Sequence, residues 1–349
     1  MRVVLLLSLA SIAAAYQYIE GEVTWNIDRL DETKPVWPNW NKDLADYDPF
    51  DTGAGTVVYI VGTGIHNVHN NFGPGLIRQS VTYDFDPDNV PQGQDTDGRG
   101  TMLSGVVGGS YTGAAAGVEL STVRVTADPS YQNLNGTYLI EGMQAIVDDY
   151  INRKTLNPTN YLRGVALGGM WFDVATLDPA LLDVVENLVD EMVANDLVVV
   201  VNVGMGNQTN CTNFTPGRMY ETEGIIAVGG VDRLDYKSPL SNYGECAELW
   251  APMEDIWSSS IDFNDTARVD YYATSEPDIS YASAHVAGVT AIVRGHCPDA
   301  PNNVIAAIVR NMAIENGGTA LMPGTDEELG PVVRVPTTKE VDYIPACSL

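Results

Sequence analysis

Positively charged residues are scarce in this sequence. Its 349 residues include 18 Lys and Arg against 46 Asp and Glu, which gives a formal net charge of -28. Such a surface repels phosphate backbones and anionic membranes, so the charge argues against a nucleic-acid partner and against a basic membrane-binding patch. Hydrophobic residues make up 45% of the chain. This composition excludes collagen-like, coiled-coil and wholly disordered proteins and is typical of a globular protein.

Long hydrophobic runs are absent beyond residues 1–15. At the start of the chain, Arg2 precedes the apolar run Val3–Ile12, and the small residues Ala13–Ala15 follow it. This is the pattern of a cleaved signal peptide, and the run is too short for a permanent membrane anchor. We therefore expect a secreted, extracellular protein whose mature chain begins near Tyr16.

Cysteine is also rare in the chain. Secretion permits disulfides, and an even set of four cysteines allows three pairings. The cysteines are Cys211, Cys246, Cys297 and Cys347. Asn-X-Ser/Thr sequons predict N-glycosylation in a eukaryotic host. The sequons are at Asn135, Asn207, Asn210, Asn213 and Asn264.

Strand and helix patterns alternate after an irregular segment over 16–55. Apolar, β-branched runs predict buried parallel strands, and apolar residues three and four apart predict helices. The expected strands are 57–61, 121–125, 164–167, 197–203 and 225–228. The expected helices are 138–153, 178–195 and 280–294. This alternation favours one α/β domain, a parallel β-sheet with helices on both faces.

Two patterns that resemble cofactor or metal sites are incomplete. The glycines of 62–64 follow a predicted strand, but a dinucleotide site needs a third glycine where the sequence has Asn67. His66 and His69 are three residues apart, and no third ligand with suitable spacing accompanies them. We therefore assign no cofactor and no metal site.

Five segments occur in an order that points to one family. They are VVYIVGTGI at 57–65, DTDGRGTMLSG at 95–105, GVALGG at 164–169, SNYG at 241–244 with WAP at 250–252, and ISYASAHVAG at 279–288. Together they resemble the subtilases, the subtilisin-like serine proteases, and specifically the proteinase K-like branch. The resemblance implies a subtilisin-like fold and peptide hydrolysis by a Ser-His-Asp triad.

The same resemblance implies that the catalytic machinery is incomplete. Ser280 stands at the position of the nucleophile, and Arg99 stands at the position of the base. Gly62 takes the place of the carboxylate that orients the base, and Met205 takes the place of the oxyanion-binding Asn. A guanidinium stays protonated and has no acceptor, so Arg99 cannot act as a general base. Gly62 has no side chain, and the thioether of Met205 cannot donate to an oxyanion. Asn207 would replace Met205 as the hydrogen-bond donor to the oxyanion only if its loop were shifted toward the position of the oxyanion.

We therefore expect a catalytically inactive pseudoprotease that binds an extended peptide, a protease inhibitor or another extracellular protein. A serine-type endopeptidase with residual or unconventional activity dependent on Ser280 is the alternative. The resemblance implies a substrate groove in which a peptide adds as a strand, with Arg99 favouring acidic peptides. Its two flanking segments are Gly113, Ala114 and Ala115 on one side and Leu167, Gly168 and Gly169 on the other.

The resemblance also implies several structural features. It pairs Cys211 with Cys246, which leaves Cys297 with Cys347. Relatives often bind structural calcium, and Glu248 falls near one such ligand position, but the loop differs and we assign no site. The expected division is a subtilisin-like domain over 56–315 and a C-terminal segment over 316–349 packed on it. No prodomain is recognisable before the first strand, and a shortened gene sequence is the alternative explanation.

Overall fold

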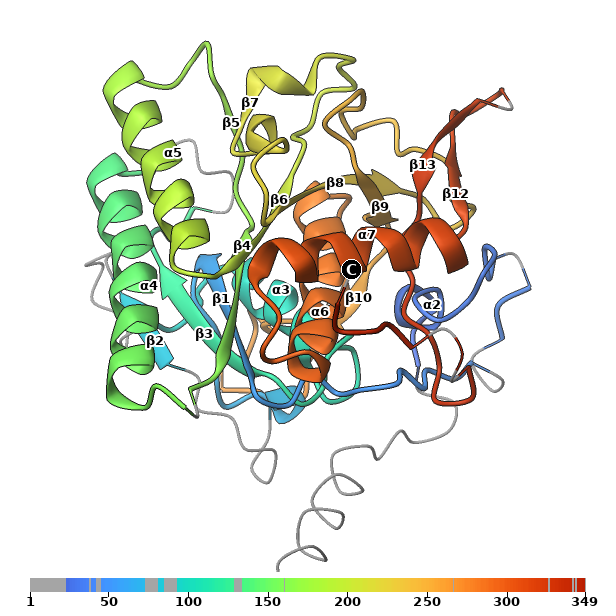
Figure 1. Ribbon diagram of the computed structural model, residues 1–349, viewed down its shortest axis with the longest axis horizontal. Helices are drawn as coiled ribbons and strands as arrows, with labels where there is room; N and C mark the ends of the chain where they lie inside the picture. Colours follow the sequence, from blue (N-terminus) through green and yellow to red (C-terminus); the bar gives the residue numbers. More distant parts are fainter. Residues whose placement is uncertain are drawn as a thin grey trace, which may run out of the picture.

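A parallel sheet of seven strands runs through the middle of the protein (Figure 1). The computed structural model describes residues 23–37, 39–41, 45–72, 81–84, 93–128, 134–159, 161–265, 267–325, 327–340, 342 and 344–348, without the side chains of 81–84 and 316. In spatial order the strands are β2 (Val81–Asp84), β3 (Glu119–Arg124), β1 (Thr56–Gly62), β4 (Arg163–Gly168), β6 (Val198–Asn202), β8 (Ile225–Val231) and β9 (Leu249–Pro252). Every neighbouring pair is parallel. The predicted α/β class is confirmed.

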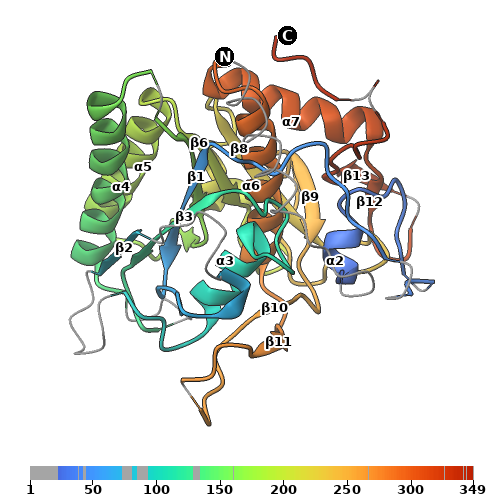
Figure 2. The same ribbon diagram turned by 90° about the horizontal axis from the view of Figure 1, so that it is seen from below.

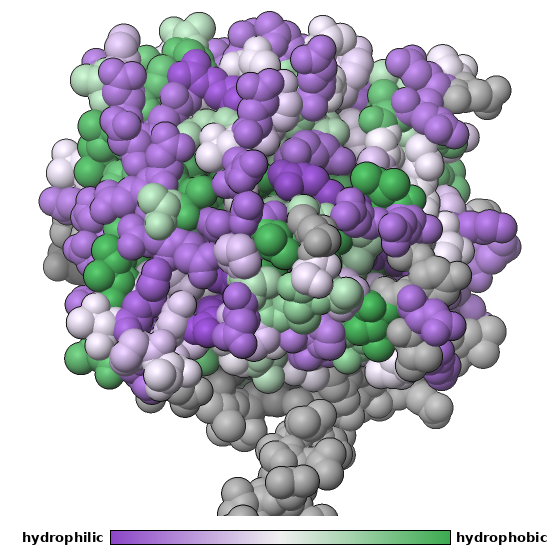
Figure 3. All heavy atoms as spheres, in the orientation of Figure 1, coloured by the Kyte–Doolittle hydropathy of each residue, from purple (hydrophilic) through white to green (hydrophobic). Residues whose placement is uncertain are grey.

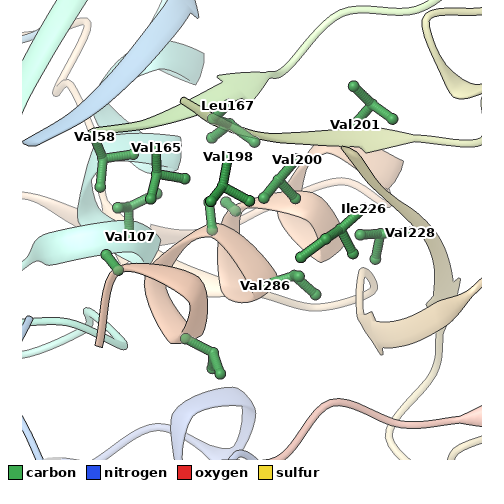
Figure 4. Packing of buried hydrophobic residues seen from close by; sticks show 14 of the residues in the cluster. Val58, Val107, Val165, Leu167, Val198, Val200, Val201, Ile226, Val228 and Val286 are labelled. Atoms are coloured by element: carbon green, nitrogen blue, oxygen red, sulfur yellow. The ribbon is translucent and has the colours of Figure 1, made fainter. Parts of the chain in front are cut away.

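The central strands bury both of their faces. Every residue of β1 and β6 is buried, which is why their sequences are continuous apolar runs and do not alternate with polar residues. Val198 and Val200 point toward one layer of helices, whereas Val201 points to the opposite side of the sheet (Figure 4). β-Branched side chains are stiff and suit this pleated, doubly covered surface.

Helices cover both faces of the sheet (Figure 2). On one face lie α4 (Gly136–Leu156) and α5 (Pro179–Ala194). On the other lie α3 (Arg99–Gly108) and α6 (Ile279–His296), with α7 (Asn302–Asn316) packed against α6. The outer surface around α7 is mostly hydrophilic, with small hydrophobic areas between the polar side chains (Figure 3).

Helix α6 is buried from Ile279 to Arg294. Its small residues allow close packing, and Gly288 shows why: a Cβ there would lie 2.6 Å from the Cβ of Ala114 and 3.0 Å from the carbonyl oxygen of Val107. α6 can therefore approach α3 and the turn after it only because this position is glycine.

The N-terminal segment is held by residues far along the chain. It contains the short helix α2 (Trp25–Asp28). After α2, Arg29 forms a buried ion pair with Asp235 at 2.8 Å. The carbonyl of Asp31 accepts a hydrogen bond from Arg334 Nε at 2.9 Å. This segment and the chain beyond α7 thus contribute to the same structure as the sheet.

Short antiparallel pairs and single turns complete the fold. The pairs are β5 (Phe172–Asp173) with β7 (Phe214–Thr215), β10 (Trp257–Ser259) with β11 (Tyr272–Thr274), and β12 (Thr319–Leu321) with β13 (Glu328–Pro331). The 3₁₀ turns are η1 (Asn70–Phe72), η2 (Cys211–Asn213) and η3 (Gly217–Met219). β10 lies directly on α3. A Cβ at Gly105 would come within 2.2 Å of the Ser258 hydroxyl, so this close approach requires glycine.

All of the strands and helices that the sequence predicted are confirmed, with bounds shifted by a few residues. Two long helices were missed. α3 contains Gly100, Gly105 and Gly108, and glycine is a poor helix former. α7 carries Val304, Ile308 and Met312 at helical spacing, a signal that would have found it. The predicted signal peptide over 1–15 lies outside the described residues.

The predicted pairing of the cysteines is confirmed. Cys211 is bonded to Cys246, and Cys297 is bonded to Cys347. All five sequon asparagines are exposed to solvent, as glycosylation would require. None of the described helices is long and apolar enough to cross a bilayer.

Two buried carboxyl groups lie beside the N-terminal helix. Asp28 accepts a hydrogen bond from the amide of Asp46 at 3.1 Å, and Asp31 accepts one from the amide of Asp48 at 3.0 Å. Burial raises the pKa of Asp28 to about 7 and that of Asp31 to about 8, and the negative charge of neighbouring carboxylates adds to both shifts. Both groups therefore hold protons in the folded protein under conditions where the unfolded chain has released them.

Replacing Asp31 by Asn is expected to stabilise the protein, and more at pH 8 than at pH 5. The folded pKa lies above the ordinary value of 3.8, so the stability contributed by the protonated group is complete below 3.8 and is lost as the pH rises toward 8. The loss is about 1.4 kcal/mol per pH unit for one proton. Asn keeps an oxygen for the Asp48 amide and cannot ionise.

Urea unfolding at both pH values measures the effect. Asp190→Asn, an exposed change on α5, controls for loss of one negative charge. Equal changes in unfolding free energy for the two substitutions at both pH values would contradict the raised pKa of Asp31.

Candidate active site

Ser280 lies in the first turn of α6, at the carboxyl end of the sheet. Asp278 is the N-cap residue of this helix, and its Oδ1 accepts a hydrogen bond from the Ser280 amide at 2.8 Å. An acidic N-cap satisfies one of the unpaired amides of the first turn and complements the helix dipole. The cap therefore fixes where α6 begins and where the Ser280 side chain points.

The Ser280 hydroxyl is enclosed by protein groups. It donates to the carbonyl of Gly169, just after β4, at 2.7 Å, and it accepts a hydrogen bond from Arg99 Nη2. Arg99 Nη2 also donates to the Gly169 carbonyl at 3.1 Å. Ser280 is 0% exposed and Arg99 is 8% exposed. A substrate carbonyl has no open path to the hydroxyl in this arrangement.

Arg99 is the first residue of α3, and the loop before the helix positions it. Asp95 accepts hydrogen bonds from the amides of Asp97, Gly98 and Thr101 and from the Thr101 hydroxyl, at 2.6–3.0 Å. Gly98 has a φ of 101°, a conformation that side-chain-bearing residues rarely adopt. This turn directs the Arg99 side chain toward the first turn of α6.

The charge of Arg99 is compensated inside the site. Its guanidinium forms a two-pronged ion pair with Asp278, with a closest distance of 2.9 Å. Burial would raise the pKa of Asp278, but the guanidinium and the hydrogen bonds from Ser280 and Arg99 outweigh burial and hold this pKa below its usual range. Asp278 already compensates the charge of Arg99, so this ion pair weakens the argument that Arg99 favours acidic peptides, and that preference stays a prediction.

No group that contacts Ser280 Oγ in the described part of the site is a base comparable to an imidazole. A general base must accept the hydroxyl proton, and the groups that contact Ser280 Oγ are a carbonyl oxygen, a guanidinium and the Asp278 carboxylate. Despite burial, the guanidinium holds the pKa of this carboxylate below its usual range, which makes it a weak proton acceptor. A guanidinium has no acceptor, and a backbone carbonyl is far too weak a base. The site can bind or hold a hydroxyl, but its described groups do not supply the proton transfer that acylation needs.

Gly62 and Met205 contribute no polar side-chain group to the site. Gly62 ends β1 and pairs with Arg124 of β3. Met205 is half-buried and bridges to Ser241 through its backbone. The nearby Asn207 is exposed, and its Oδ1 accepts a hydrogen bond from Lys237 at 2.8 Å. Asn207 is thus held by Lys237, and we find no bond between it and Ser280 in the described part of the chain.

One half of the predicted peptide groove is wrong. Ala114 and Ala115 are 0% exposed, and their amides donate to the carbonyls of Val106 and Val107 at 2.9 Å. Gly113 is equally buried, and its amide donates to the Gly109 carbonyl. The segment is a core turn packed against α3, so its backbone cannot pair with a peptide.

The other predicted half leads to the candidate site at the end of β4. Leu167 and Gly168 are the last two residues of β4 and pair with β6, and the carbonyl of Gly168 accepts a hydrogen bond from Asn202 at 3.3 Å. Gly169 follows them and contacts both Ser280 and Arg99. Peptide binding along this segment stays a prediction, because the carbonyl of Gly169 is already engaged.

The histidines serve structural roles. His69 Nε2 lies 2.7 Å from the carbonyl of Tyr271, and its Nδ1 accepts from the Asn71 amide. His66 Nε2 lies 3.2 Å from the Arg268 carbonyl. Both rings therefore join the loop after β1 to the segment around β11.

His285 is buried inside α6 and faces α2. Its Nδ1 lies 2.7 Å from the Tyr281 carbonyl, so this nitrogen carries the proton, and its Nε2 accepts a hydrogen bond from Asn26 at 3.0 Å. Burial lowers the pKa of His285 to about 4. The neutral ring thus docks the N-terminal helix on α6 and is not available to Ser280.

Glu248, the residue near the family's calcium position, is engaged by protein groups. It forms an ion pair with Arg310 at 2.9 Å and accepts a hydrogen bond from the Ala227 amide at 3.0 Å. A carboxylate satisfied in this way has a structural role between α7 and β8.

The chain belongs to the subtilase family, whose profile matches residues 53–331. Alkaline serine exoprotease A of Vibrio alginolyticus is 30% identical over 305 residues, which are 87% of this chain and 49% of that protein. Proteinase R of Parengyodontium album is 27% identical over 269 residues, 76% of this chain and 59% of that protein. The chain thus spans about half to three-fifths of the length of these relatives. The crystal structure of a cold adapted subtilisin-like serine proteinase shares the fold, with a TM-score of 0.69 and 24% identity over 90% of this chain and 98% of that chain.

Asp278 is the site residue that sequence reasoning missed. Pro277 and Asp278 directly precede the predicted helix, and an acidic residue at that point is a helix-start signal. That signal would have identified the cap, but not the ion pair, because Arg99 is 179 residues away in the sequence.

Removing the charge of Asp278 is expected to destabilise the protein. Asp278→Asn retains an N-cap oxygen but leaves the guanidinium of Arg99 without its partner, which should cost about 1–3 kcal/mol because a carboxylate that is partly exposed contributes less than a fully buried one. Asp278→Ala also loses the cap and should cost about 1 kcal/mol more. Urea unfolding of each variant measures these differences.

The double variant Arg99→Gln/Asp278→Asn completes a mutant cycle. It should recover part of the loss, because neither charge is then left alone. If the losses in unfolding free energy caused by the two single substitutions simply added up in the double variant, the ion pair would not contribute to the stability of the site.

Proposed function

We propose that this chain is a secreted, catalytically inactive member of the subtilase family that acts by binding. The contact of the Arg99 guanidinium with the Ser280 hydroxyl carries the proposal. It supports the proposal because a permanently protonated group stands where the nucleophile needs an acceptor.

The size of the catalytic loss supports the same reading. In subtilisin, removal of the histidine alone lowers turnover about a million-fold. Loss of one oxyanion donor lowers it by a further factor of about 10²–10³. With Met205 at the oxyanion position and Gly62 at the carboxylate position, the remaining rate would be close to that of the uncatalysed reaction.

A serine-type endopeptidase is the second candidate. Ser280 keeps its place at the start of α6, and the relatives are named as proteases. In this reading Ser280 would use a base that approaches only after the contact with Arg99 is broken, since the Asp278 carboxylate is the one proton acceptor beside it in the described site and its pKa lies below the usual range. Activity dependent on Ser280 is what separates this candidate from a binding protein.

The candidate ligands are an extended peptide, a protease inhibitor and another extracellular protein. The buried core turn at Gly113–Ala115 and the engaged carbonyl of Gly169 disfavour an extended peptide lying across Ser280. Both features leave the outer surface free for a folded inhibitor or protein. An extracellular setting is in keeping with a relative named Extracellular serine proteinase, from Thermus sp. (strain Rt41A).

The purified protein is expected to hydrolyse casein and chromogenic peptides at the background rate, equal to that of its Ser280→Ala variant. It should also resist labelling by a fluorophosphonate probe, since Ser280 is buried and has no base comparable to an imidazole. Hydrolysis is followed by absorbance and labelling by intact-protein mass.

Two controls accompany this experiment. Proteinase R, assayed in parallel, shows that substrate and probe are competent, and circular dichroism shows that both forms of this chain are folded. Activity or labelling that disappears in Ser280→Ala would overturn the proposal in favour of an endopeptidase.

A further inference from the structure

The β10–β11 hairpin projects from the body of the molecule (Figure 2). Its first strand is fixed on α3, because the hydroxyls of Ser258 and Ser259 donate to carbonyls of that helix at 3.0 Å and 3.1 Å. Its returning limb, residues 268–272, pairs with β10 and also contacts the loop after β1. The amide of Asn70 donates to the Val269 carbonyl at 2.6 Å, and two histidine rings lie against neighbouring carbonyls. The contact between the limb and the loop thus includes imidazole groups, which titrate near neutral pH.

His69 uses both of its ring nitrogens in this region. Its Nδ1 accepts a hydrogen bond from the Asn71 amide at 3.0 Å and therefore carries no proton. The proton of the neutral ring must then be on Nε2, which donates to the Tyr271 carbonyl at 2.7 Å. His69 is 0% exposed, so water has little access to replace either partner. Only the neutral tautomer with its proton on Nε2 satisfies both contacts.

A second proton on His69 is incompatible with this arrangement. A protonated imidazole donates from both nitrogens, so Nδ1 would direct a proton at the N–H of Asn71. That amide would lose its acceptor in the interior, which is costly. Asn71 is held in place, because its side chain donates to Thr112 Oγ1 at 2.8 Å and accepts from the Tyr111 amide at 2.9 Å. The ring of His69 must then turn or leave, and its bond to the Tyr271 carbonyl is broken.

Titratable groups face His69 from the elements packed around it. They are His66 on the same loop, Asp270 and its ion-pair partner Arg268 on the hairpin, and Tyr272 of β11. α3 packs against η1, and its one charged residue is paired with Asp278. Burial lowers the pKa of His69, and the charge of His66 lowers it further. The Tyr271 carbonyl and Asp270 act on this pKa in the opposite direction without reversing the shift.

We propose that His69 is an acid-sensitive latch, whose protonation separates the returning limb of the hairpin from the loop after β1. The contact is complete above the ordinary imidazole pKa of 6.5, and it is lost as the pH falls from 6.5 toward the lower pKa of the folded protein. Both parts also line a cavity of about 690 Å³, the loop through Asn70 and the hairpin through Trp257 and Tyr272. Separation would change the wall of this cavity, so the surface offered to a binding partner would differ between neutral and acidic surroundings.

Hydrogen exchange of the full secreted chain at pH 7 and pH 5, followed by mass spectrometry, tests the proposal. The rates are corrected for the pH dependence of exchange in unprotected amides. Amides of the hairpin over 256–275 and of the loop over 63–72 are expected to exchange about tenfold or more faster at pH 5, because the open form binds one more proton than the closed form. Amides of β6 and β8, at the centre of the sheet, should exchange equally at both pH values.

Variants identify the group that responds. His69→Gln keeps an N–H for the Tyr271 carbonyl but cannot take up a proton, so exchange of its hairpin should be equal at both pH values. His296→Gln, at the carboxyl end of α6, removes another imidazole and should keep the full response of the parent chain. If His69→Gln does not fold, nitrogen-15 spectra of the four histidines of the parent chain supply the test. His69 must then gain its second proton over the same pH range in which the hairpin opens.

Four outcomes would overturn the inference. The first two are equal exchange of the hairpin at pH 7 and pH 5, and the same acceleration in His69→Gln as in the parent chain. The third is acceleration of every part of the chain together, which would show unfolding of the whole molecule. The fourth is a proton on Nδ1 of His69 at pH 7. Because Ser280 is untouched in these variants, the hydrolysis experiment is independent of each outcome.

Discussion

The carboxylate of Asp278 satisfies two demands of the fold at one point. It accepts the Ser280 amide and so begins α6, and it neutralises the guanidinium that begins α3. α6 is buried along nearly its whole length, so its first turn has little access to water as an alternative partner. The buried guanidinium of Arg99 likewise needs a partner from the protein. The start of α6, its contact with α3 and the enclosure of Ser280 therefore all depend on the side chain of Asp278.

Much of the fold followed from local patterns. The valines of β6 and the apolar run of β1 indicated strands buried on both faces, because no other element uses short continuous β-branched runs so consistently. Asp178 and Pro179 marked the start of α5 in the same direct way. α3 was different. Its glycines allow close approach of other segments: Gly105 of β10, Gly100 of the turn after β1, and Gly108 of the chain around Leu120. This tertiary demand opposes helix propensity and hides the helix from sequence reasoning.

The candidate site was predictable only in part. The family resemblance put Arg99 and Ser280 at one site, and the two residues are in contact. Peptide binding by the segment that ends in Gly169 stays a prediction. The triplet Gly113–Ala115 misled, because small residues serve equally well for an exposed strand edge and for a tight turn in the core, and only the buried amides distinguish the two. The neutralisation of Arg99 is not visible in a linear pattern, since Arg99 and Asp278 are 179 residues apart.

The hydrogen bond between Asp31 and Arg334 also limits when the N-terminal segment can form its contacts during synthesis. It joins residues 303 positions apart, and the neighbouring Leu30 carbonyl likewise accepts from the amide of Val335 at 2.8 Å. At ribosomal rates of about 5–20 residues per second, about 15–60 s separate the synthesis of the two partners. Through that interval the first-made helix lacks these anchors. The contacts of this segment therefore become available in sequence, that of Arg29 with Asp235 before those with Arg334 and Val335.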